Sequence, residues 1–102
     1  MKHLVWIIHV DLKLDTADFL HNIEGVKGFT FTSVEWHGLQ SEADSYLSDR
    51  DKVIGHTPRV RVDILLEDKD VTSVLTSLRK SNIGSKKQGI YWITAVEEYN
   101  HL

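Results

Sequence analysis

Hydrophobic and polar residues alternate most regularly in residues 59–67, RVRVDILLE. Successive side chains of a β-strand point to opposite faces, so a period of two divides these residues into two sets. The aliphatic set consists of Val60, Val62, Ile64 and Leu66. The other set, which is mainly polar, consists of Arg59, Arg61, Asp63 and Leu65. The segment therefore predicts a strand with one face in the core and one more polar face.

Three further segments predict strands. Residues 3–11 (HLVWIIHVD) and 90–96 (IYWITAV) are short runs rich in β-branched and aromatic residues. Residues 29–37 (FTFTSVEWH) alternate polar and apolar positions. In the run at 3–11 the apolar residues, Val10 included, occupy both parities, which predicts that this strand is buried on both faces.

Two segments predict helices. Residues 16–24 follow Asp15, a favoured capping residue, and precede Gly25, a favoured helix stop. The apolar stripe of this helix is Phe19, Leu20 and Ile23. The second helix begins after Asp68 or Asp70, and the segment SNIGSKKQG ends it. Its apolar residues recur with a helical period, at Val71, Val74, Leu75 and Leu78.

The order of these elements is β-α-β, a long polar segment, and β-α-β again. Two such units predict an α+β fold of the ferredoxin-like type, βαββαβ, in which a four-stranded antiparallel sheet has two helices on one face. A length of 102 residues corresponds to one domain, 1–102, with a long loop at about 38–57. Loops of that length in compact domains are usually functional or disordered.

The other face of the sheet has no helix to cover it, and we expect its composition to be mixed. The residues expected there are Ile7, Leu65 and either Tyr91 or Trp92, which are apolar, and His9, Arg61 and Asp63, which are polar. Such a mixture suits a subunit interface with a few paired charges. The alternative is a half-solvated face of a monomer, because antiparallel sheets often expose one side.

The composition narrows the classes of function. The chain is 41% hydrophobic and 26% charged, which is typical of a folded protein, and its net charge of −3 offers no basic surface for nucleic acid. It has no cysteine, which excludes thiolate metal sites and cysteine nucleophiles. The longest apolar run, LVWII, is far shorter than the roughly 20 residues of a membrane span, and no signal-peptide pattern precedes it. We therefore expect a soluble, cytoplasmic protein that does not insert into a membrane.

Six histidines in a chain without cysteine make a metal site the sharpest chemical hypothesis. Glu35 and His37 stand two apart on a predicted strand, so their side chains share a face. Glu42 and Asp44 follow in the loop, and His56 stands where the loop returns. Imidazole and carboxylate ligands suit a divalent transition metal ion such as Zn²⁺, Cu²⁺ or Ni²⁺. The alternative is that these are solvated side chains without a specific ligand.

Two other features have a structural interpretation. His9 and Asp11 form a second pair two residues apart, for which we expect a structural hydrogen bond, or an interface pair with Arg61, rather than catalysis. Trp36 alternates with His37, so we expect it to point to the opposite face and to pack in the core or in an interface.

Three stretches carry a resemblance to a known family. GVKGFTFTSVEWHG (25–38), PRVRVDILLED (58–68) and SNIGSKKQGIYWITAVEE (81–98) are similar to the corresponding parts of PII-like proteins, which are trimeric, ferredoxin-like signalling domains with a long loop between the second and third strands. The HG at 37–38 and the third strand at 59–66 resemble a subgroup often encoded beside heavy-metal efflux systems. The resemblance covers nearly the whole chain.

The resemblance implies a non-enzymatic regulatory or sensor protein. It implies a homotrimer that binds a small ligand or metal ion at its subunit clefts and signals through the loop, residues 39–57, to a partner such as a membrane transporter or efflux protein. Nucleotide-binding relatives have a basic segment after the last strand, whereas this chain has EEYNHL there, and an acidic tail repels phosphate. This departure argues against ATP as the ligand.

A function from another class uses the same topology. Small enzymes of the dimeric α+β barrel type use the open sheet face as a pocket. For this chain that alternative predicts a dimer and a cavity lined by His9, Trp6 or Trp92.

Overall fold

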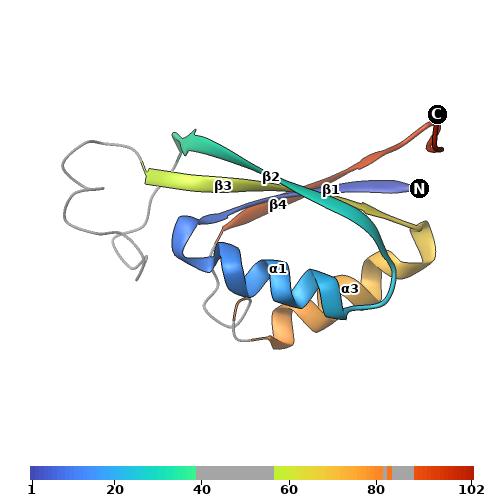
Figure 1. Cartoon of the computed structure of the whole chain (residues 1–102), viewed down its shortest axis with the longest axis horizontal. Coiled ribbons are helices and arrows are strands. Elements are labelled where there is room, and N and C mark those ends of the chain that lie inside the picture. Colours follow the sequence, from blue (N-terminus) through green and yellow to red (C-terminus); the bar gives the residue numbers. More distant parts are fainter. Residues whose placement is uncertain (39–56, 82, 84–88) are drawn as a thin grey trace.

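The computed structural model describes residues 1–38, 57–81, 83 and 89–102 (Figure 1). Four antiparallel strands form one sheet in the order β2-β3-β1-β4, and both helices pack against the same face of it. The strands are β1 (Lys2–His9), β2 (Val26–Trp36), β3 (Thr57–Leu66) and β4 (Ile90–Ala95). The helices are α1 (Lys13–Asn22) and α3 (Val71–Lys80), each preceded by a short 3-10 turn, η1 (Val10–Leu12) and η2 (Asp68–Asp70). The ferredoxin-like α+β prediction is confirmed.

The core lies between the sheet and the helices. The aliphatic set of β3 faces it, as the alternation predicts, and so do Leu4, Trp6 and Ile8 of β1. Helix α1 contributes Leu20 to this core, and helix α3 contributes Val74, Leu75 and Leu78. Burial of an aliphatic side chain of this size contributes about 1.5–3 kcal/mol, so this cluster is the main stabilising feature of the fold. In the described part of the chain, neither helix is long and apolar enough to cross a membrane.

The first strand ends two residues earlier than the sequence predicts. After His9 the chain turns into η1, and Val10 is 44% exposed instead of buried in the core. The reason is a cap that the pattern of apolar residues does not reveal. The His9 side chain accepts a hydrogen bond at Nδ1 from the Asp11 backbone N–H at 3.1 Å, and this bond stabilises the turn.

The predicted helix caps are partly wrong. Helix α1 begins after Leu12, and Asp15 lies in its first turn, where a carboxylate is favoured by the helix dipole instead of by a capping bond. Asp70 does stand at the N-cap of α3, but its side chain makes no capping bond. Gly25 has a φ of +99° and forms the turn into β2, which begins at Val26 with an irregularity between Val26 and Gly28. The second strand therefore begins three residues earlier than predicted and ends one residue earlier, at Trp36.

Candidate functional site

The sheet face that no helix covers is the first candidate surface. Directly paired residues of neighbouring strands share a face, and the pairs Val5–Trp92 and Ile7–Arg61 place these side chains opposite the core. Of the two aromatic residues considered from the sequence, Trp92 is therefore the one on this face. Although no helix covers them, Val5 and Ile7 are only 1% and 4% exposed. This face therefore has a buried apolar centre beneath a layer of larger side chains.

A polar network crosses this face over three strands. Arg61 donates from Nε to both carboxylate oxygens of Asp63 at 3.2 Å and from one terminal nitrogen to Oδ1 at 3.0 Å. His3 Nε2 lies 2.7 Å from the same Oδ1, and His3 Nδ1 lies 3.4 Å from the Thr94 hydroxyl. The Arg61 guanidinium also stacks over the Trp92 ring, 6.0 Å from its centroid. The network neutralises its own charge, because the carboxylate and the guanidinium are paired within one chain.

Asp63 is held in its ionised form. Burial by itself would raise the pKa of Asp63, but the hydrogen bonds and positive charges of Arg61 and His3 outweigh it, and the pKa lies below its ordinary value. A carboxylate whose pKa is lowered on folding contributes stability above its unfolded pKa of about 3.9. That contribution is lost as the pH falls through the folded pKa.

We therefore predict that the stability difference between the protein and its Asp63→Asn variant shrinks in acid. At neutral pH the variant should unfold at lower urea concentration, because Arg61 and His3 lose a charged partner. As the pH falls below about 4 and then through the lowered pKa of folded Asp63, the two midpoints should converge, since Asp63 becomes protonated. Urea unfolding followed by circular dichroism at several pH values measures this, and a difference that stays constant down to acid pH would contradict it.

The second candidate surface is the end of β2. The structure places His37 Nε2 3.3 Å from Glu35 Oε2, and both side chains are 65% exposed. Trp36 points to the other face and is partly buried, as the alternation predicts, and a Cβ atom at Gly38 would lie 2.9 Å from its ring. The stretch therefore combines a packed aromatic residue with an exposed pair of potential metal ligands.

The remaining residues of the predicted metal site cannot be placed beside this pair. Glu42, Asp44 and His56 lie outside the described residues. Among the residues that the structure does describe, no three His, Asp or Glu side chains come together as a metal-binding group. The described part of the predicted site thus holds two side chains of the kinds that coordinate metals, one imidazole and one carboxylate, and a metal ion there would need further ligands from elsewhere.

The pair His9 and Asp11 has the structural role expected of it. His9 is buried, and its Nδ1 accepts from the Asp11 backbone while lying 3.5 Å from the Asp11 carboxylate. Arg61, the other partner considered for His9, donates a hydrogen bond to Asp63 in the same chain. Trp6 faces the core and Trp92 faces the open side, so these two aromatic residues do not line one cavity.

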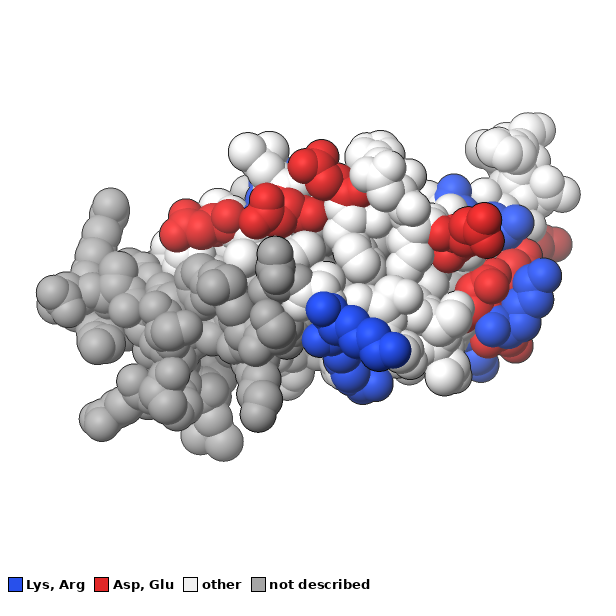
Figure 2. Space-filling view, turned by 90° about the horizontal axis from the view of Figure 1, so that it is seen from below, with Lys and Arg blue, Asp and Glu red and all other residues white. Residues whose placement is uncertain are grey.

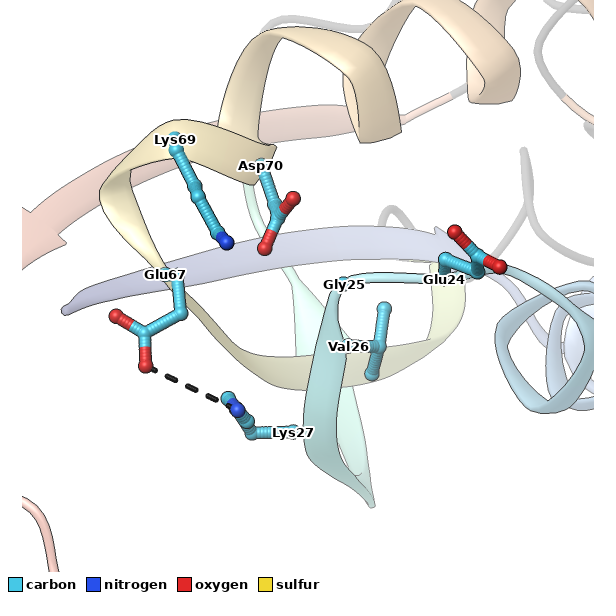
Figure 3. Close-up of a pocket in the computed structure, with 7 residues that line it drawn as sticks. All are labelled: Glu24, Gly25, Val26, Lys27, Glu67, Lys69 and Asp70. Atoms are coloured by element: carbon cyan, nitrogen blue, oxygen red, sulfur yellow. Dashed lines mark ion pairs between the residues drawn. The ribbon is translucent and has the colours of Figure 1, made fainter.

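One hollow that the sequence analysis missed lies at the other end of β2. It measures about 520 Å³ and is formed where α1 leads into β2 and where β3 leads into η2 (Figure 3). Its lining consists of Glu24, Gly25, Val26, Lys27, Glu67, Lys69 and Asp70. Lys27 Nζ lies 3.9 Å from Glu67 Oε1, so charges of both signs are already paired there. The hollow is polar and solvent-accessible, unlike the mostly apolar pockets that bind small organic ligands.

The strand order, the two helices on one face and the long segment between β2 and β3 define a ferredoxin-like domain of the PII-like class. The chain belongs to the family described as "Protein of unknown function (DUF3240)", which matches residues 2–102. It is 30% identical over 99 residues to nitrogen regulatory protein P-II 2 of Methanothermobacter thermautotrophicus strain Delta H, covering 96% of this chain and 85% of the relative. The predicted resemblance to PII-like proteins is confirmed.

A solved structure supports the same fold. The crystal structure of a DUF3240 family protein from Shewanella baltica OS155 superposes with a TM-score of 0.77, covering 99% of this chain and 94% of that one. The two sequences are 20% identical, so this similarity concerns the fold alone.

Proposed function

We propose that this protein is a non-enzymatic PII-like regulator that acts as a cytoplasmic homotrimer. The observation that carries the proposal is the 30% identity to a nitrogen regulatory protein along almost the entire chain. The open sheet face supplies the surface for assembly. Its centre is apolar and its carboxylate is paired within the chain, so copies can meet there without bringing uncompensated charges together.

The loop at 39–57 is the proposed signalling element. It leaves the sheet directly after the Glu35 and His37 pair, so a ligand bound at the pair would act on the start of the loop. A loop that changes its order on binding is a physically sufficient switch. The proposed partner is a membrane transporter or efflux protein that the loop contacts.

A divalent transition metal ion is the ligand that these two residues suit best. A histidine nitrogen and a carboxylate oxygen are both ligands for Zn²⁺, Cu²⁺ and Ni²⁺. We propose Glu35 and His37 as ligands, with Glu42 or His56 completing the set. ATP is a weaker candidate, because Glu97 and Glu98 are exposed after the last strand, where their negative charges would repel phosphate groups.

We predict that His37→Ala lowers metal affinity at least tenfold, because even the loss of a group that only supports a metal ligand typically costs roughly 10–100-fold. His21→Ala is the matched control, because His21 is also exposed and its ring packs against Phe29 at 4.9 Å instead of facing Glu35. Titration calorimetry with Zn²⁺, Cu²⁺ and Ni²⁺ measures the affinity. Equal affinities for the two variants would rule out the proposed site.

Native mass spectrometry of the same protein tests the assembly and the ligand together. A trimer that gains metal ions but no ATP agrees with the proposal. A dimer would instead favour the α+β barrel enzyme, and a trimer that takes up ATP would replace the proposed ligand.

A further inference from the structure

The outer surface of helix α1 carries an apolar side chain that the described chain leaves uncovered. Leu14 is 79% exposed, whereas the apolar residues of α3 lie on its inner side. Single exposed leucines are common on protein surfaces, so the residues around Leu14 decide whether it has a role.

Carboxylates surround this leucine. Asp15 and Asp18 are exposed on α1, and Asp18 lies about one helical turn from Leu14. Asp11 is exposed in the preceding turn η1, three residues before Leu14. Figure 2 shows acidic side chains in a row along one side of the helix layer. Asp11 lies 3.5 Å from His9 Nδ1, and within the described residues Asp15 and Asp18 form no ion pair.

Among the described residues, the cations near this row have other contacts. The Lys13 ammonium lies over the Phe31 ring of the sheet, 5.5 Å from its centroid. Arg79 lies on α3, where it donates to the Tyr91 hydroxyl at 2.8 Å. The helix dipole favours Asp15 in the first turn, but Asp18 lies beyond that turn. The outer side of α1 is therefore both negatively charged and locally apolar.

We propose that the surface formed by Asp11, Leu14, Asp15 and Asp18 docks a basic protein segment in which an aliphatic side chain is flanked by lysine or arginine. The aliphatic group packs on Leu14, and the flanking cations pair with the carboxylates. This surface lies on the helix layer, away from the open sheet face, so assembly through that face leaves it accessible (Figure 1). The docking requires neither a metal ion nor the loop, and it goes beyond the proposed function.

The test uses a synthetic peptide with arginine residues on both sides of a central pair of leucines, titrated into the full chain by calorimetry. We expect Leu14→Ser to weaken binding about tenfold, because a buried aliphatic contact is lost without a change of charge. The double variant Asp15→Asn, Asp18→Asn should weaken binding by a similar factor and reduce its dependence on salt.

Two matched controls separate docking from general attraction. Leu102→Ser removes another exposed leucine, and the double variant Glu97→Gln, Glu98→Gln changes the net charge by the same amount. Both should bind the peptide as the unchanged protein does. If Leu14→Ser binds as tightly as the unchanged protein, or if the Glu97 and Glu98 variant loses as much affinity as the Asp15 and Asp18 variant, the proposal is wrong.

Discussion

Gly89→Ala should destabilise the protein by on the order of 3 kcal/mol, a large part of the 5–15 kcal/mol that a domain of this size has. Gly89 has a φ of +89°, which residues with a Cβ atom rarely adopt. A Cβ atom there would also clash with the backbone oxygen of Ile7. Because the obstacle is backbone and not a flexible side chain, β4 must move away from β1 to relieve it.

Gly28→Ala is the matched control for this experiment. A Cβ atom at Gly28 would meet no atom within 4 Å, and this glycine is not among those with a positive φ. We expect its midpoint of urea unfolding to stay close to that of the unchanged protein, while the midpoint of Gly89→Ala falls. Equal midpoints for the two variants would show that β4 can shift at little cost.

The sequence predicts the sheet well where one face of a strand is aliphatic. In β3 the alternation has only one register that buries Val60, Val62 and Ile64, so both faces of that strand follow from the pattern. In β4, whose sequence is IYWITA, apolar residues occupy both parities, so the pattern alone does not decide between Tyr91 and Trp92. The pairing of Trp92 with Val5 of β1 decides it, and that pairing is a property of the tertiary structure.

The candidate sites also differ in how far the sequence alone predicts them. Glu35 and His37 stand two residues apart where β2 ends, so the sequence alone predicts that they meet. The contact of His3 with Asp63 joins residues 60 positions apart, and its contact with Thr94 joins residues 91 positions apart. These contacts depend on the register of three strands, which local patterns do not specify. The end of β1 differs from the prediction for a related reason, because a histidine cap interrupts an apolar run that would otherwise continue.

Trp92→Ser should separate the subunits of the proposed trimer. Trp92 lies on the open sheet face and is 39% exposed in the single chain, so an assembled copy can bury the rest of its ring. Buried tryptophans in interfaces are commonly hot spots, and truncating one costs about 2 kcal/mol or more. The variant also frees Arg61 from its stacking contact, which leaves a more hydrated cation on the face that must be buried.

Tyr91→Ser distinguishes a loss of assembly from a loss of folding. Tyr91 precedes Trp92 on the same strand, is 42% exposed and points to the helix side of the sheet, so its removal should destabilise the single chain by a similar amount. Native mass spectrometry and light scattering at matched concentration should find Tyr91→Ser trimeric and Trp92→Ser dissociated. If the two variants dissociate together, the edge of β4 and not the open face holds the subunits. If neither dissociates, the open face is not the interface, and its paired Asp63 and Arg61 then serve the stability of the single chain.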